Sequence, residues 1–538
     1  MEGPWDVVIV GAGSAGAALA ARLSGSADRR VLLLEAGQDW RSAEAPHEVR
    51  SANPIPLLRQ THLQAAWQWP GLMSRRTIAQ QPRLYWRGRG LGGSSIVNGQ
   101  IAIRGAPDAF DEWAAGGCEG WGWRDVLPYF RRLEADEFFG DQPYHNAEGP
   151  LPVYRAPLDR WGPVDLASRQ AALDLGYPWN DDLNAPVGEG VSCYPINSRD
   201  GQRVTTNDAY LEPIRNRPNL TICGDALVDR VIVRDGKARS VRVLLEGAWV
   251  EIAADAVVLS AGAVHSPAIL WRSGLGPADA LNRLGISVVK DLPEVGRNFM
   301  DHPILHLTMR LKPEFRLPHP DARHTNCCLT YSSGMPGTGR RDMIMMSFNH
   351  RGMKGEPRGE AGSLSPAVFQ AFSRGELTLV SPRPEDDPFI DERMLSDPRD
   401  IARMRDAARR VAALVQRPAF ERIVERATVG ESDVALGDVS SMDDADLDAL
   451  LLAEASDIQH AAGTCRMTGF DNEDGVVDPN CRVKGVSGLY VVDASVMPSD
   501  CRANTHLTTV MIGELIGDRF GRPVRAETDT AAAGEADA

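Results

Sequence analysis

The chain has 538 residues, 43% of them hydrophobic and 24% charged, a composition typical of soluble globular proteins. At roughly 150 residues per domain, this length predicts about two to four domains. Acidic residues outnumber basic ones by 73 to 58, and the net charge of −15 disfavours a nucleic-acid partner. No apolar run approaches the roughly 20 residues of a membrane-spanning helix. The N-terminus also lacks the positive start of an export signal, so we expect no membrane association and a cytoplasmic location.

The first element is a βαβ unit, "WDVVIVGAGSAGAALAARLSGSADRRVLLLEAG", at residues 5–37. Gly11, Gly13 and Gly16 separate a short apolar strand from an Ala- and Leu-rich helix. Such glycines let backbone N–H groups approach a pyrophosphate at the start of the helix. Glu35 ends the second strand, where a carboxylate can bind a ribose hydroxyl. The unit predicts a dinucleotide site; a glycine-rich turn in an unrelated α/β protein is the alternative.

Two later stretches are predicted to join the same sheet. Residues 226–263 indicate a β-meander, with hairpin turns at Asp235–Gly236 and Glu246–Gly247 between alternating runs. Residues 488–498, "GLYVVDASVMP", contain a further apolar strand that ends at Asp493. Ligands of open α/β sheets bind at the carboxyl ends of strands, so we expect Asp493 to bind a sugar or ribityl chain. A turn-forming aspartate is the alternative.

The predicted fold class combines α/β and α+β architecture. A Rossmann-like nucleotide domain with a β-meander is expected beside a substrate domain of antiparallel sheet and helices. Residues 397–416 form the clearest helix of the second domain, an amphipathic pattern that starts with Asp397 and Pro398. The nucleotide domain is assigned to 1–154, 226–315 and 460–522, and the substrate domain to 155–225 and 316–459. We expect the polar tail, 523–538, to be disordered.

Several motifs together resemble the glucose–methanol–choline (GMC) oxidoreductase family. They are the opening βαβ unit, "GRGLGGSSIVNGQIAIRG" at 88–105, "GAVHSPAILWRSGLGP" at 262–277 with "VGRNFMDHP" after it, "HAAGTCRM" at 460–467, and "ANTHLTTVMIGE" at 503–514. The resemblance runs from about Asp6 to Phe520. It implies bound FAD, a cap-like substrate domain and oxidation of an alcohol. Within the family, the chain looks most like bacterial pyridoxine 4-oxidase, 5-hydroxymethylfurfural oxidase and choline dehydrogenase.

The resemblance also assigns catalytic residues. His460 takes the position of the histidine that removes the hydroxyl proton, and an unperturbed imidazole pKa near 6.5 suits a general base. His506 matches the second residue of the pair, which would hold the developing alkoxide by a hydrogen bond. The alcohol carbon would then pass hydride to flavin N5. Cys465 is expected to be a packed side chain without a redox role.

The cofactor is expected to be non-covalent FAD. Members with covalently attached flavin carry a histidine before the asparagine of the second block, where this chain has Val97 before Asn98. The helix expected after His506 would bring its positive N-terminus to the flavin ring. The predicted cofactor-binding residues are Gly11, Gly13, Ser14, Ala15, Gly16, Glu35, Ala36, Arg89, Gly92, Gly93, Ser94, Asn98, Gly99, Val228, Ala261, Asp493, Ala494, Leu507 and Thr508.

Other functions stay open at this point. A hydroxynitrile lyase that uses FAD structurally shares the motifs, and the βαβ unit alone fits an NAD-dependent dehydrogenase. We expect no metal, because Pro303 lies between His302 and His306 and the eight cysteines form no C-x-x-C pair. The expected partners are a small alcohol and O2 or another electron acceptor, with a mild bias toward neutral or cationic substrates from the acidic composition. The sequence does not set the oligomeric state.

Overall fold

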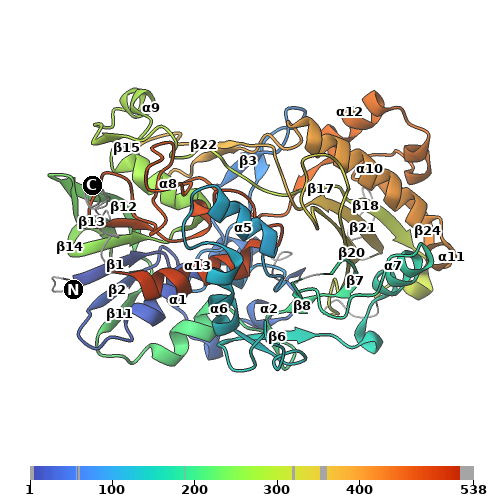
Figure 1. Cartoon of the computed structure of the whole chain (residues 1–538), viewed down its shortest axis with the longest axis horizontal. Helices are drawn as coiled ribbons and strands as arrows, with labels where there is room; N and C mark the ends of the chain where they lie inside the picture. The colour runs from blue at the N-terminus through green and yellow to red at the C-terminus, as the bar shows by residue number, and fades with distance from the viewer. Residues whose placement is uncertain are drawn as a thin grey trace, which may run out of the picture.

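The computed structural model describes residues 5–521 except 56, 58–60, 187, 318–321 and 352–359. The predicted disordered tail, 523–538, lies outside the described residues. Figure 1 shows two parts side by side along the long axis, one built on a seven-stranded sheet and the other on an eight-stranded sheet. Within the described ranges, no helix has the length and apolar character needed to cross a membrane.

The seven-stranded sheet begins with the predicted βαβ unit. Its parallel strands are β11 (Leu220–Cys223), β2 (Val31–Leu34), β1 (Trp5–Val10), β14 (Ala248–Leu259) and β26 (Leu489–Val491). Helix α1 (Ser14–Leu23) connects β1 to β2. Strand β2 and most of β1 and β26 are buried, as expected for continuous apolar runs in a parallel sheet that is covered on both faces.

The predicted β-meander is confirmed. Strands β12 (Leu227–Arg234), β13 (Lys237–Leu245) and β14 pair antiparallel in sequence order. All four predicted turn residues have positive φ, 52° at Asp235, 69° at Gly236, 49° at Glu246 and 80° at Gly247. Positive φ at both central residues is the geometry of the hairpin turn that matches strand twist.

The eight-stranded sheet is antiparallel throughout. In order it contains β24 (Val424–Val429), β18 (Leu307–Leu311), β21 (Ala361–Val368), β20 (Met343–Arg351), β19 (Cys327–Tyr331) and β7 (Gly190–Cys193), with β17 (Pro303–Ile304) and β25 (Ser456–Asp457) attached beside β21. Helices α7 (Pro163–Asp174) and α10 (Pro398–Val415) pack on one face. The predicted start of α10 is confirmed, since the Asp397 side chain accepts a hydrogen bond from the Arg399 amide at 2.9 Å.

The two sheets draw on segments that the predicted domain ranges separate. Strand β11 lies within 155–225 but pairs with β2, and β18 lies within 226–315 but pairs with β21 and β24. Both strands are only four or five residues long, so their sequence pattern carries little information about their partners.

The remaining elements include a small third sheet and several helices of the first part. Strands β3 (Met73–Arg75), β4 (Arg83–Leu84), β22 (Glu376–Thr378) and β23 (Phe389–Asp391) form a small mixed sheet, and helices α5 (Pro107–Ala115), α6 (Trp123–Leu133), α8 (Gly262–Arg272) and α13 (Thr505–Arg519) surround the seven-stranded sheet. Helix α13 contacts α1 and α6 and is buried without a break from Leu507 to Ile516. It is therefore a central core helix, apolar on more than one face.

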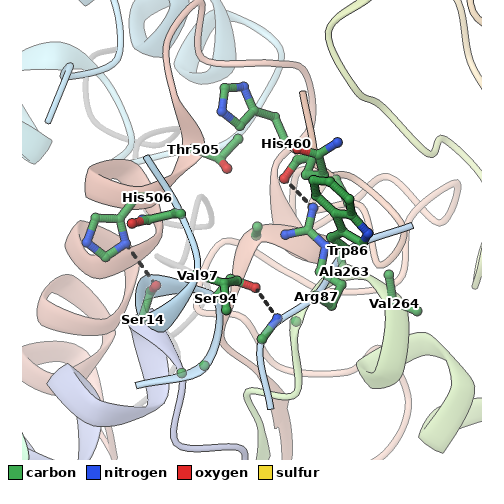
Figure 2. Close-up of a pocket in the computed structure, with 18 of the residues that line it drawn as sticks. Ser14, Trp86, Arg87, Ser94, Val97, Ala263, Val264, His460, Thr505 and His506 are labelled. Carbon is green, nitrogen blue, oxygen red and sulfur yellow. Dashed lines mark hydrogen bonds between the residues drawn. The ribbon is translucent and has the colours of Figure 1, made fainter. Parts of the chain in front are cut away.

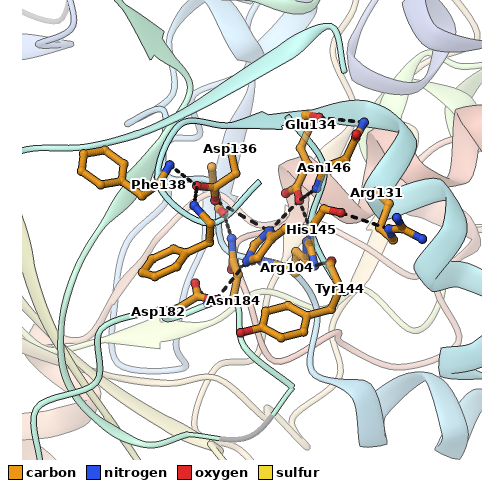
Figure 3. A network of polar contacts seen from close by, with 12 residues as sticks. Arg104, Arg131, Glu134, Asp136, Phe138, Tyr144, His145, Asn146, Asp182 and Asn184 are labelled. Carbon is orange, nitrogen blue, oxygen red and sulfur yellow. Dashed lines mark hydrogen bonds and ion pairs between the residues drawn. The ribbon is translucent and has the colours of Figure 1, made fainter. Parts of the chain in front are cut away.

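Figure 3 shows a buried polar network around β5 (Glu134–Asp136), the strand that directly follows α6. The His145 ring lies between two carboxylates, with Nδ1 at 2.6 Å from Glu134 and Nε2 at 2.9 Å from Asp182. Arg104 and Arg155 bind the same carboxylates. Glu134, Asp136 and His145 are close enough to hold a metal ion. The two guanidinium groups and the His145 ring, however, already bind the three carboxylates, so we assign the network a structural role.

Candidate functional site

A cavity of about 510 Å³ lies at the carboxyl ends of β1, β14 and β26 and continues to the eight-stranded sheet. Its wall includes Gly11, Glu35 and Asp493 from the first part and Ile304, Met346 and Phe348 from the second. Figure 2 shows the middle of this cavity, where the start of α1, the second glycine-rich loop and the start of α13 meet. The cavity is in the size range of small-molecule sites.

The three glycines of the first loop have different neighbours. A Cβ on Gly11, which has φ +101°, would lie 2.4 Å from the Ser260 carbonyl oxygen, and one on Gly16 would lie 2.0 Å from the Gly11 carbonyl oxygen. A Cβ on Gly13 would meet no described protein atom closer than 3.9 Å. The first and third glycines therefore permit the tight turn and helix packing, while the second opens onto the cavity. This division fits a pyrophosphate approaching Gly13.

Glu35 is held in place by the backbone. Its carboxylate accepts hydrogen bonds from the amides of Ala12 at 2.9 Å and of Gly37 and Gly90 at 3.0 Å. Burial raises the pKa of Glu35, and these three bonds oppose the shift. Since a carboxylate has about four lone-pair sites, one remains for a hydroxyl from the cavity. The ribose role predicted for Glu35 fits this geometry.

Asp493 is anchored in a similar way at the end of β26. Its Oδ2 accepts from the Gly262 amide at 2.9 Å and the Ser266 hydroxyl at 2.6 Å, and its Oδ1 accepts from the Ser495 amide at 2.8 Å. Burial raises its pKa against these bonds. The side chain lies in the cavity wall, so it both organises the turn and remains available to a ligand.

The second glycine-rich loop packs directly against the first. A Cβ on Gly93 would lie 2.8 Å from the Gly13 Cα atom, so only glycine permits this contact. The Arg203 guanidinium donates to the carbonyl oxygens of Ser95 at 3.0 Å and Asn98 at 2.7 Å, which fixes the loop from behind. Val97 lies in the cavity wall (Figure 2).

Most predicted site residues line this one cavity. They are Gly11, Gly13, Ser14, Ala15, Glu35, Ala36, Gly93, Ser94, Asn98, Gly99, Val228, Ala261, His460, Asp493, Ala494 and His506. Gly16, Arg89, Gly92, Leu507 and Thr508 lie behind the wall. The Arg89 side chain donates to the Ala36 carbonyl oxygen at 3.0 Å, and the side chains of Leu507 and Thr508 are fully buried.

His460 has a partner on each ring nitrogen. Its Nδ1 lies 2.9 Å from Nδ1 of His302, and its Nε2 lies 3.0 Å from Nδ2 of Asn504. Burial, with the nearby His302 and Arg87, lowers the pKa of His460 well below its ordinary value. Burial alone lowers the pKa of His302 to about 3. Both rings are therefore neutral near pH 7.

Asp301 fixes the backbone of both histidines. Its Oδ1 accepts from the amides of His302 at 2.7 Å and His460 at 2.9 Å, and its Oδ2 accepts from the Tyr85 hydroxyl at 2.5 Å. Burial, followed by repulsion from Asp457, raises the pKa of Asp301 to about 7. The sequence prediction missed His302, Asn504 and Asp301 as site residues, although "DHP" and "ANTH" belong to the family motifs.

His506 lies in the first turn of α13, on the same cavity but turned toward α1. Its Nδ1 is 2.9 Å from the Ser14 hydroxyl (Figure 2). Burial and the Arg203 charge lower its pKa to about 4. No hydrogen bond joins His506 to His460; Asn504, the residue before α13, contacts His460 instead. Cys465 is fully buried and burial raises its thiol pKa well above normal, so it is packed and unreactive.

His302 and His306, the two histidines considered for metal binding, contact other side chains. His306 Nδ1 lies 3.0 Å from the Ser365 hydroxyl, and His302 contacts His460. His265, also in the cavity wall, stacks on Trp69 with ring centres 3.9 Å apart.

Comparisons with known proteins agree with this architecture. Residues 5–304 and 371–513 match two family models, both described as GMC oxidoreductase. A 5-(hydroxymethyl)furfural oxidase of Methylovorus sp. (strain MP688) is 35% identical over 532 residues, covering 96% of this chain and 98% of that protein. An oxygen-dependent choline dehydrogenase of Ectopseudomonas mendocina (strain ymp) is 34% identical over 568 residues, covering 97% and 94%.

Among solved structures, pyridoxine 4-oxidase from Mesorbium loti superposes with a TM-score of 0.86 at 30% identity, covering 96% of this chain and 99% of that one. These are the kinds of enzyme that the motifs indicate. The two glycine-rich loops, the anchored acids and the histidine pair over one cavity, together with these matches, establish that the chain belongs to the GMC oxidoreductase family of FAD flavoproteins.

Proposed function

We propose that the protein oxidises a primary alcohol to an aldehyde, with His460 as the general base. The observation that carries this proposal is the neutral His460 ring, held on both nitrogens, in the cavity that continues into the dinucleotide cradle. FAD, when bound, supplies the acceptor for the hydride that leaves the alcohol carbon. The protein's own contribution is to orient the alcohol and take its hydroxyl proton.

The partners of His460 select the tautomer that a base needs. If His460 Nδ1–H donates to Nδ1 of His302, then Nε2 of His460 carries a lone pair and accepts from the Asn504 amide. This arrangement satisfies every hydrogen bond with both rings neutral. An entering hydroxyl that takes over the contact with Nε2 meets the lone pair that removes its proton. His302 is therefore a positioning residue for the base.

His506 is proposed as the second catalytic residue. Because Ser14 contacts Nδ1, Nε2 is the nitrogen left to face a substrate oxygen. The residue also lies at the start of α13, a helix of 15 residues, whose N-terminus carries about half a positive charge. That end of the helix would stabilise negative charge that develops beside it.

The cofactor is proposed to be held without a covalent bond, because Val97 offers no nucleophile where covalent family members carry histidine. Acid precipitation should therefore leave a colourless protein pellet and a yellow supernatant. A yellow pellet would contradict the assignment.

The test is anaerobic mixing of the holoenzyme with a panel of aromatic and aliphatic primary alcohols, followed at the flavin absorbance. One alcohol should bleach the flavin, and His460→Ala should slow the bleaching by about 10²–10⁴-fold. His47→Ala, a change at an exposed histidine, is the matched control and should leave the rate unchanged. An unchanged rate in His460→Ala would remove the base assignment.

The same experiment separates the rival functions. Recovery of the colour on admitting air distinguishes reoxidation by O2 from dependence on another acceptor. Bound FAD that no alcohol bleaches would favour the lyase function instead.

A further inference from the structure

The wall of the cavity opposite the nucleotide loops is one face of β20. Met346, Phe348 and His350 alternate along the strand and line the cavity. Asn349 faces the other way, toward α7, where its Oδ1 accepts from the Val164 amide at 2.9 Å. This is the ordinary alternation of a strand.

Arg351 breaks the alternation. A regular strand would turn it to the side of Asn349, but it lines the cavity together with His350. The pairing of β20 with β21 shifts register between Phe348 and Arg351. Such bulges re-aim side chains beside active sites. The irregularity therefore brings a guanidinium group into the wall formed by β20, which otherwise presents apolar side chains and an imidazole ring to the cavity.

The side chain of Arg351 is partly buried and makes no hydrogen bond or ion pair with any residue that the structure describes. Burial lowers its pKa to about 10, an effect that Arg76 reinforces and Glu431 opposes. The group is therefore still charged near neutral pH. An unpaired charge away from bulk water is costly, so a partner supplied from the cavity would be favoured.

Among the residues that the structure describes, no carboxylate forms an ion pair with Arg351, and Glu431 acts on it only through its charge. Arg76 also lines the cavity, but it is paired with Asp457. His306 is kept neutral, because burial and the charges of Arg351 and Arg76 lower its pKa well below normal. Arg76 is close enough to Arg351 to affect its pKa, and the charge of Asp457, the partner of Arg76, acts on Asp301, which accepts from the His460 amide. Arg351 therefore lies toward the catalytic half of the cavity.

We propose that the substrate is a primary alcohol that also carries a carboxylate, which Arg351 binds while the hydroxyl group contacts His460. This proposal rests on the proposed function and narrows its substrate class. A planar carboxylate accepts two parallel N–H bonds from a guanidinium. A positive charge that pairs with no described carboxylate, beside the neutral imidazole of His306, matches a single negative charge and opposes a cationic substrate.

The first experiment measures binding without turnover. Holoenzyme is titrated with benzoate and with benzamide, its uncharged analogue, and the flavin absorbance reports occupancy. Benzoate should bind roughly 10- to 100-fold more tightly than benzamide, the range of a charged hydrogen-bonded pair. Arg351→Gln should abolish the difference. Arg234→Gln, which removes an exposed arginine on β12, should preserve it.

The second experiment compares 4-(hydroxymethyl)benzoate with 4-methylbenzyl alcohol in anaerobic flavin reduction. Arg351→Gln should lower kcat/KM for the carboxylate by roughly 10- to 100-fold and leave the neutral alcohol unchanged. Equal benzoate and benzamide binding in the unmodified enzyme would overturn the carboxylate proposal, whatever the reduction rates. Tight benzoate binding through Arg351 without reduction by any alcohol would support the anion site and count against the proposed alcohol oxidation.

Discussion

His302 offers the sharpest test of how the site works, because its predicted effect is on the tautomer of another residue. His302→Leu replaces a fully buried ring by an apolar side chain and leaves the Nδ1–H group of His460 without an acceptor. An unsatisfied buried donor costs about 1–3 kcal/mol. His460 then shifts to the tautomer with its proton on Nε2, which cannot accept the proton of an alcohol.

The size of the effect follows from that cost. A penalty of 1–3 kcal/mol lowers the fraction of base-competent His460 by about 5- to 150-fold, and the rate of flavin reduction falls by the same factor. Because the ground-state contacts of the alcohol do not include His302, the change should appear in kcat and leave KM nearly constant. Stopped-flow reduction of the holoenzyme under anaerobic conditions measures both.

His302→Asn is the matched control, because its amide oxygen can accept from His460 near the place of Nδ1. It should recover most of the rate that His302→Leu loses. FAD content and melting temperature, measured for both variants, identify a loss that is merely structural. The reasoning fails if His302→Leu, with full FAD content, reduces its flavin at the rate of the unmodified enzyme.

Two further predictions concern the cofactor cradle and the buried network. Gly13→Ala should keep its melting temperature but bind FAD roughly tenfold more weakly or worse, because the added Cβ enters the cavity and meets no described atom closer than 3.9 Å. Gly11→Ala should instead lose stability, because its Cβ would lie 2.4 Å from the Ser260 carbonyl oxygen. Full FAD affinity in Gly13→Ala would show that no cofactor approaches that glycine. Burial lowers the pKa of His145, but its bonds to Asp182 and Glu134 outweigh burial and raise it above the ordinary value. Its stabilisation is therefore complete below the unfolded pKa of about 6.5 and declines as pH rises through the folded pKa. The melting temperature should fall over that range, and His145→Gln, with no imidazole to titrate, should lack this component; parallel pH profiles would disprove the linkage.

The sequence predicted the parts of the site that are local in the chain. These parts are the glycine spacing, the acid after β2, the paired turns of the meander and the cap of α10. Each depends only on residues that are neighbours in the sequence, so a short sequence pattern is enough to predict it. Contacts such as His302 with His460 join residues 158 positions apart. No pattern within either motif shows that contact. His506, predicted as the second residue of the catalytic pair, contacts Ser14. The position of Arg351 could not be predicted for another reason. Regular strand alternation would place its side chain on the face away from the cavity, and only the register shift in β20 turns it into the cavity.

The charge of the whole chain is a poor guide to the charge of its cavity. A composition with net charge −15 favours neutral or cationic substrates at long range. At physiological ionic strength, however, exposed charges are screened within about 8 Å, whereas buried ones are screened much less. In the catalytic half of the cavity the described charged groups are Arg76, Arg87, Arg351 and Asp457, and Asp457 is already paired with Arg76. Recognition is decided at this short range. His460 is kept neutral by burial first and by His302 and Arg87 next, so the base does not depend on the charge of Arg351, and the two groups can be tested separately.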